Sequence, residues 1–217
     1  MKTNTSSGKN DPKKKTPITR ETRRAILNSA RRLYNEQGVT NVSMRTIAAD
    51  VDISVGNLTY YFPKKKDLVS ALMTDDIEET IVREPMEGLA RLNSVFEGML
   101  RSLLRNPFFF LDDQVRTMIG AQETVNIQQV HGQIDPVLDE MIAKGLLSPD
   151  FQGNTRKDVM GILLLSHISW LKSVVRPDPL FRLTLQEILG AHWTVLYPWL
   201  TDEGREEYDR VKTEWAE

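Results

Sequence analysis

Apolar residues recur every three or four positions along most of this chain, and no stretch alternates with a period of two. This spacing indicates amphipathic helices and gives no sign of a sheet. A first helix is predicted from about Arg20 to Gln37, capped by Thr19 or Thr16 and ended by Gly38. Further helices are predicted at about 44–51, 55–61, from 64 onward, 89–104, 108–120, 122–144 with a kink at Pro136, 155–175, 183–200 and 202–215. The predicted fold class is therefore all-α.

The two shortest predicted helices are the most informative part of the chain. Ser43 and Ser54 are placed to cap them, because a serine hydroxyl accepts a hydrogen bond from an otherwise unpaired N–H of the first turn. An apolar residue before each cap can pack on the helix behind it, and the two pairs are Val42 with Ile47 and Ile53 with Leu58. Two capped helices joined by so short a turn must cross steeply. This is the arrangement of a helix-turn-helix that enters the DNA major groove.

Charge is distributed unevenly along the chain. Residues 1–70 hold 14 Lys and Arg against 6 Asp and Glu, whereas residues 71–217 hold 14 against 24. A basic first third favours contact with a polyanion through that part alone. Part of the excess comes from a Lys-rich stretch at 1–17, which is predicted to be a disordered basic arm that either touches DNA or is merely solvated.

Several classes of protein are disfavoured by the composition. The chain has no cysteine, which excludes disulfides and thiolate metal sites, and its three histidines lack the spacing of metal ligands. No nucleophile elbow, phosphate-binding glycine loop or dinucleotide fingerprint is present, so we expect no enzyme, no metal and no cofactor. The N-terminus lacks the apolar core of a secretory signal, and the apolar run Val159–Leu171 is short and interrupted for a membrane span. We expect a cytoplasmic protein with a buried helix at 155–175.

The N-terminal residues resemble the TetR/AcrR family of bacterial transcriptional regulators over about residues 19–72. The resemblance rests on the order and spacing of short elements rather than on any one of them: Ala25-Ile26-Leu27 with Ala30 and Leu33, Gly38-Val39-Thr40, Ile47-Ala48, Ile53-Ser54 with Gly56, and Tyr60-Tyr61-Phe62 with Lys65 and Leu68. It implies a homodimer in which each subunit has a DNA-binding head, here 18–80, and a helical body for effector binding and dimerisation, here 81–217.

Three positions depart from the family pattern. Asp52 stands in the turn where glycine is usual, Thr59 where an aromatic residue is common, and Tyr61 where histidine is common. Asp tolerates a left-handed backbone less readily than Gly, but better than most residues. These departures bear on base preference rather than on the fold.

The face of helix 55–61 opposite Leu58 and Phe62 is predicted to meet DNA. Asn57 can pair with adenine, and the methyl groups of Val55 and Thr59 can pack on thymine. Because this helix carries no Arg or Lys, we expect a site read through apolar contacts, adenine and DNA shape. The predicted DNA-binding residues, including those that the resemblance implies for the phosphates, are Ser43, Arg45, Thr46, Val55, Gly56, Asn57, Thr59, Tyr60, Tyr61 and Lys65. Packing between head helices is the alternative role for the two tyrosines.

The body carries bulky aromatic residues that either line an effector cavity or fill the core and the dimer interface. His167, Trp170, His192 and Trp193 are the predicted ligand-binding residues, and Phe108 to Phe110 are further candidates for the cavity. The resemblance places the dimer surface on helices 155–175 and 183–200. A two-fold dimer would separate the two reading helices by about 34–36 Å, one DNA turn, or somewhat more.

The predicted function is a sequence-specific transcriptional regulator that does not interact with a membrane. It would act as a repressor that leaves a palindromic operator in double-stranded DNA when an unidentified small-molecule effector binds the body. The alternative is a helical protein that coats DNA or binds partners without responding to a small molecule.

Overall fold

A computed structural model of the chain describes residues 19–80, 86–119, 132, 134–176, 183–213 and 215. Within these residues the fold is all-α, without strands, apart from one isolated bridge between Leu147 and Leu200. The elements are α1 (Arg20–Gln37), α2 (Met44–Asp50), α3 (Val55–Tyr61), α4 (Lys65–Thr80), α5 (Gly88–Arg105), α6 (Pro107–Leu111), α7 (Asp113–Ile119), a helix at 134–143, α9 (Gly153–Val175), α10 (Leu185–Leu196), the 3₁₀ turn η1 (Tyr197–Trp199) and α11 (Asp202–Val211). The all-α prediction is confirmed.

Local signals between residues 19 and 62 act as predicted. The hydroxyls of Thr19, Ser43 and Ser54 accept hydrogen bonds from the N–H groups three residues later, at 3.0–3.1 Å. Gly38 ends α1 at φ 79°, a left-handed conformation that suits glycine. The starts of α1, α2 and α3 and the end of α1 are thus set by residues at their own boundaries.

Other boundaries differ from the prediction. Two helices replace the single helix expected at 108–120, because the extended backbone of Asp112 separates α6 from α7. Residues 134–143 are helical and include Pro136, and the earlier part of the helix predicted at 122–144 lies mostly outside the described residues, so the kink at Pro136 stays a prediction. The predicted arm at 1–17 and the predicted helical start at 122–131 lie outside the described residues.

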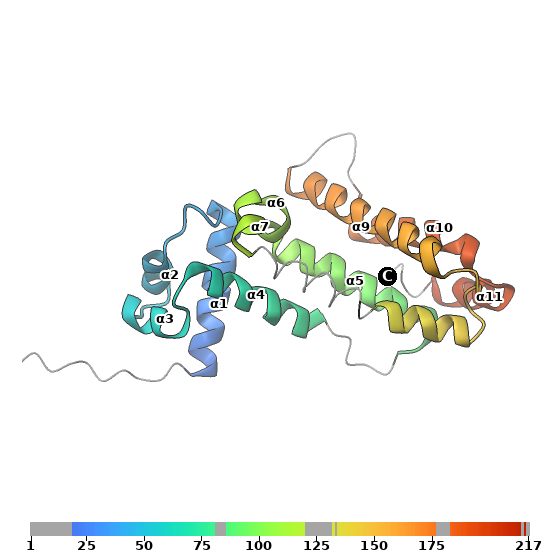
Figure 1. Cartoon of the computed structure of the whole chain (residues 1–217), viewed down its shortest axis with the longest axis horizontal. Coiled ribbons are helices and arrows are strands. Elements are labelled where there is room, and N and C mark those ends of the chain that lie inside the picture. The colour runs from blue at the N-terminus through green and yellow to red at the C-terminus, as the bar shows by residue number, and fades with distance from the viewer. Residues whose placement is uncertain are drawn as a thin grey trace, which may run out of the picture.

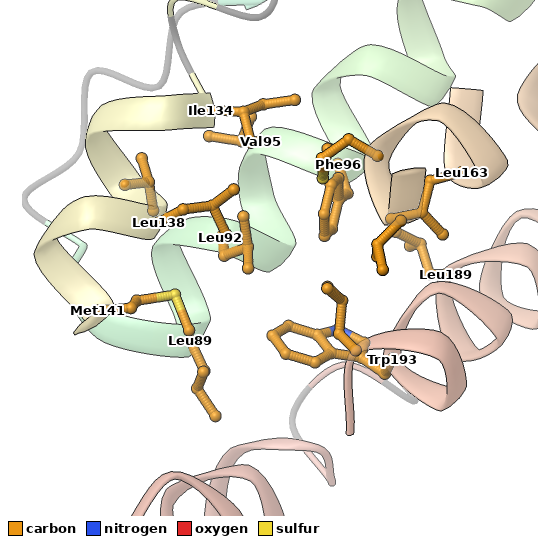
Figure 2. Close-up of a cluster of buried hydrophobic side chains, with 14 of the residues drawn as sticks. Leu89, Leu92, Val95, Phe96, Ile134, Leu138, Met141, Leu163, Leu189 and Trp193 are labelled. Atoms are coloured by element: carbon orange, nitrogen blue, oxygen red, sulfur yellow. The ribbon is translucent and has the colours of Figure 1, made fainter. Parts of the chain in front are cut away.

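The apolar residues form two clusters, one in the head and one in the body. Helices α1 to α4 enclose the head cluster at one end of the molecule, while α5 runs along the middle beneath α9 and α10 (Figure 1). Figure 2 shows the centre of the body cluster, where Leu92 and Phe96 of α5 lie between Leu138 on one side and Leu163 and Trp193 on the other. The body core is therefore built from α5, α9, α10 and the helix at 134–143.

Helices α6 and α7 contribute to the head core although they follow α5 in the chain. Phe108, Phe109 and Val115 are buried in the head cluster, and the Phe108 ring packs edge-on against Tyr34 of α1 with centroids 5.4 Å apart. Of the roles left open for Phe108 and Phe109, the structure shows core packing, and the core is that of the head rather than that of the body. Of this aromatic run, only Phe110 also packs against the body cluster.

Helix α9 is less buried than predicted. Its 23 residues are long and apolar enough to cross a membrane by length and composition alone, although core helices of soluble proteins pass the same test. One face, with Leu163 and Trp170, packs into the body core. The other face leaves Ile162 and Leu165 exposed by 55% and 72%, so the chain has an uncovered apolar surface there.

Two histidines lie in contact inside the body. The Nε2 atoms of His167 on α9 and His192 on α10 are 2.9 Å apart, and the Phe96 ring packs against His192 with centroids 5.2 Å apart. Burial lowers the pKa of His167 to about 4 and, together with the neighbouring His167, that of His192 to about 3. Both rings are consequently neutral at pH 7, and one donates its proton to the other.

We predict that this pair makes the protein sensitive to mild acid. A histidine with a lowered folded-state pKa is protonated more readily in the unfolded chain, so the free energy of unfolding decreases as the pH falls below about 6.5. Urea unfolding at pH 7.5 and pH 5 measures the decrease. The double variant His167→Leu/His192→Phe removes both groups and should lose less stability over the same range. An equal loss in the wild type and the double variant would contradict this assignment.

Candidate nucleic-acid interface

Helix α3 has one buried and one open face. Leu58 is fully buried and Phe62, just after the helix, is 7% exposed, both within the head cluster. Gly56 and Tyr60 are exposed, and a Cβ added at Gly56 would meet nothing within 4 Å. The packing of Leu58 therefore leaves Gly56 and Tyr60 on the open face, with Asn57 and Thr59 partly exposed, whereas Val55 is partly buried and packs against the head cluster.

The side chains on this outer face differ in what they can offer to DNA. Thr59 donates its hydroxyl to the Val55 carbonyl oxygen at 2.9 Å, which directs hydrogen bonding back into the helix and leaves the methyl group for contacts. Asn57 is partly buried, and its backbone N–H is bound by the Ser54 cap. The Tyr60 and Tyr61 rings lie edge to face, 4.8 Å apart, and are 63% and 38% exposed. Tyr61 is thus not enclosed between head helices.

The turn between α2 and α3 depends on Asp52. This residue has φ 52°, as predicted for the position where the family usually has glycine. Its N–H donates to the Ala49 carbonyl oxygen at 3.2 Å, and the N–H of Ile53 donates to that of Ala48 at 2.9 Å. The left-handed residue thus closes the turn and sets the angle between the two helices.

The N-terminus of α2 lies at the surface beside this face. Ser43, Arg45 and Thr46 are all exposed, and the hydroxyl oxygens of Ser43 and Thr46 are 2.8 Å apart. Arg45 makes no ion pair within the described part of the chain. It therefore keeps its charge available for an external anion.

Much of the remaining positive charge in the head is neutralised internally. Arg32 pairs with Asp50 at 2.6 Å, and Arg23 and Arg31 lie 3.5 and 3.6 Å from the Asp75 carboxylate. Ser29 also donates to Asp50, at 2.6 Å, and this bond and Arg32 lower the pKa of that carboxyl. The two contacts of Asp50, with Ser29 and Arg32, hold the end of α2 against α1. Sequence reasoning missed them because they join residues 18 and 21 positions apart.

Lys65 has an unexpected environment for a residue predicted to grip DNA. Its Nζ atom donates to the Val39 carbonyl oxygen at 2.6 Å and lies 3.5 Å from that of Thr40. Burial lowers the pKa of its ammonium group, and the nearby Asp112 carboxylate acts in the opposite direction. In this structure the ammonium group is directed toward the α1–α2 loop.

The four predicted ligand-binding residues lie on α9 and α10 and are buried, which brings the two histidines into contact. The indole N–H of Trp193 donates to the Asn93 side-chain oxygen at 2.9 Å, and that of Trp170 to the Leu183 carbonyl oxygen at 2.8 Å. Trp193 also stacks on Trp215 with centroids 5.0 Å apart. The His192 Nδ1 atom is buried without a hydrogen-bond partner. Among the described residues there is no group of three or more His, Asp or Glu able to hold a metal ion.

Comparison with known proteins identifies bacterial transcriptional regulators as relatives. Residues 26–72 match the family model for bacterial regulatory proteins of the tetR family. The chain is 29% identical over 139 residues to the HTH-type transcriptional regulator UidR of Escherichia coli, a match that covers 59% of this chain and 70% of UidR. It is also 29% identical over 160 residues to the HTH-type transcriptional repressor KstR of Mycobacterium tuberculosis, covering 70% and 72% of the two chains.

Most of the chain shares its fold with solved structures. A TetR-family transcriptional regulator from Marinobacter aquaeolei superimposes with a TM-score of 0.67 at 21% identity, covering 89% of this chain and 98% of that one. The ketosteroid transcriptional regulator KstR2 of Mycobacterium tuberculosis gives a TM-score of 0.56 at 18% identity, covering 87% and 100%. Together with the capped helix-turn-helix, these similarities assign residues 26–72 to the tetR family of bacterial regulatory proteins, and most of the chain has the fold of a solved TetR-family regulator.

Proposed function

We propose that this protein is a transcriptional repressor that binds a palindromic DNA operator as a homodimer and releases it when a small molecule binds the body. The observation that carries the proposal is the orientation of α3: with Leu58 buried, Tyr60 is exposed and Asn57 and Thr59 are partly exposed, and the N-terminus of α2 is exposed as well. The relatives UidR and KstR, named as a transcriptional regulator and a transcriptional repressor, support it. Such a protein would act in the cytoplasm, where the DNA is.

The proposed contacts divide into phosphate contacts and base contacts. Arg45 and the hydroxyls of Ser43, Thr46, Tyr60 and Tyr61 would hold the DNA backbone and fix the position of the head. Asn57 would pair with a base, and Val55, Gly56 and the Thr59 methyl group would lie against base edges in the major groove. The operator would thus be selected through few hydrogen bonds and through its shape.

A second copy of the chain is the proposed partner for the open face of α9. Ile162 and Leu165 are large apolar side chains in contact with water on that face, and the outward side of α10 carries the small residues Gly190 and Ala191. Burying this surface against the same surface of another subunit would remove it from water, with about 25 cal/mol gained per Å² of apolar area. The dimer would then present two copies of α3 to successive major grooves.

The proposed effector site is the region of His167, Trp170, His192 and Trp193. An unpaired nitrogen inside a packed core is costly, and a bound molecule could satisfy His192 Nδ1 by a hydrogen bond. The variant His167→Leu/His192→Phe should therefore remain on the operator in the presence of a metabolite that releases the wild type. Normal release of this variant would place the effector elsewhere.

The first experiment is to footprint the DNA upstream of the gene and of its neighbours, then to compare affinity for the protected fragment and for mixed-sequence duplex at one salt concentration. A specific regulator binds the protected site at least about 10³-fold more tightly than mixed-sequence duplex. Similar affinity for both duplexes, or no protected palindrome, would favour the alternative of a DNA-coating protein.

Two variants should separate phosphate contacts from base contacts. Arg45→Ala should weaken binding to every duplex and reduce the slope of log K against log salt by about 0.9, the value of one phosphate contact. Asn57→Ala should keep the slope and reduce discrimination at one or two base pairs by about 1–3 kcal/mol. Fluorescence anisotropy across a salt series measures both effects. If both variants bind the operator like the wild type, the assignment of this face is wrong.

The dimer is tested by placing a charge on the open face of α9. Leu165→Glu should convert the dimer to a monomer, because a carboxylate cannot be buried there without a partner. The monomer should lose most of its operator affinity, since each head then binds alone. Analytical ultracentrifugation gives the mass. Leu104→Glu is the matched control, because Leu104 of α5 is also exposed and lies outside the proposed surface. A dimeric Leu165→Glu protein would refute this interface.

A further inference from the structure

Lys65 connects two parts of the chain that are far apart in sequence. It is the first residue of α4, and its ammonium group lies against the carbonyl oxygens of Val39 and Thr40, 26 and 25 positions earlier. Moving a lysine ammonium out of water is unfavourable unless oxygen atoms replace its hydration, and the 2.6 Å bond to Val39 provides one of them. The lowered pKa of Lys65 has the same cause, namely partial burial.

The two carbonyl groups belong to the α1–α2 loop, residues 38–43, which leads directly into α2. Val39 and Val42 are fully buried and anchor the loop from within, while Ser43 at its end caps α2. The position of this loop therefore determines the position of the N-terminus of α2, with Ser43, Arg45 and Thr46. All three are proposed phosphate contacts.

The loop is also tied to the corner between α6 and α7. The Thr40 hydroxyl donates to the Gln114 side-chain oxygen at 2.7 Å, and the Asp112 carboxylate accepts from the Gln114 N–H at 2.9 Å. Asp112 also lies close enough to Gly38 that a Cβ added there would be 4.0 Å from its Oδ2 atom. Its negative charge favours the charged form of Lys65. The loop is thus held between Lys65 on one side and the α6–α7 corner on the other.

We propose that Lys65 is a positioning residue, which clamps the α1–α2 loop against the α6–α7 corner and so sets the N-terminus of α2 on DNA, in place of the direct phosphate contact that the family resemblance implies. The proposal rests on the proposed DNA-binding function. The ammonium group has carbonyl oxygens of the chain as partners, and these contacts hold the backbone that leads to the proposed phosphate-binding residues.

Salt dependence distinguishes the two roles. Loss of a phosphate contact reduces the slope of log K against log salt by about 0.9, whereas loss of a positioning contact lowers affinity at every salt concentration and leaves the slope unchanged. Lys65→Met keeps the apolar stem and removes the charge. We expect it to bind the footprinted duplex about tenfold more weakly, the effect of losing a charged hydrogen bond, with the wild-type slope. Arg45→Ala provides the reference for a reduced slope.

A second measurement needs no DNA. In Lys65→Met, amide hydrogens of residues 39–46 should exchange about tenfold faster than in the wild type, because the loop loses its clamp, while those of α5 should not change. Lys66→Met is the matched control, since Lys66 is the next residue and its side chain is exposed. If Lys65→Met fails to fold, Gln114→Ala takes its place: it removes the Thr40 contact at a residue proposed to make no DNA contact, and should accelerate exchange of the same loop.

The outcomes are separable. A slope reduced by about 0.9 in Lys65→Met, or unchanged exchange in the loop of both variants, overturns the positioning role. Wild-type protein that binds neither the footprinted duplex nor mixed-sequence DNA refutes the proposed function, and the exchange measurement still decides whether Lys65 clamps the loop.

Discussion

The burial of Ile47 and Leu58 is the constraint on which the DNA-binding face depends. Helices α2 and α3 have seven residues each, and isolated helices of that length are unstable in water because nucleation is costly. Both side chains are fully buried in the head cluster, and each such burial contributes about 1.5–3 kcal/mol. The serine caps then decide where the helices begin, and Asp52 decides how they cross. The positions of the exposed residues on α2 and α3 therefore depend on contacts made by the buried and capping residues.

The head packs against residues 105–109, at the end of α5 and the start of α6, and is not an independent unit there. Phe108 and Phe109 enter its core from α6, Asn106 accepts a hydrogen bond from Arg31 of α1 at 3.0 Å, and the Arg105 carbonyl oxygen accepts one from Asn35 at 2.7 Å. Close-packed interiors move as blocks rather than by continuous deformation. A change in the body that displaces α5 or α6 would therefore be felt by α1, and the contacts of Lys65 and Gln114 extend this connection to the loop before α2.

Sequence reasoning succeeded where the signal is local. Thr19, Ser43 and Ser54 cap their helices through bonds to residues three positions away, and the left-handed backbone at Asp52 follows from its place in a short turn. It did not predict contacts between residues that are far apart in the chain. Examples are the hydrogen bonds of Lys65 with Val39 and of Ser29 with Asp50, and the packing of Phe108 on Tyr34. Helical spacing could show that Phe108 is buried, but not in which of two cores. The DNA contacts and the ligand-binding residues stay predictions, because they depend on the shape and chemistry of partner molecules that no pattern in the chain describes.

The shared core has a consequence for domain exchange within the family. A head cut out near residue 80 would keep Tyr34 but lose the Phe108 ring that covers it, together with Phe109 and Val115. Such a fragment would expose apolar surface at the site of the cut and be prone to aggregate. A chimera that transplants this operator specificity onto another effector-binding body should therefore carry α6 and α7 with the head, even though α5 separates them in the chain. The transferable module is defined by packing and is discontinuous in sequence.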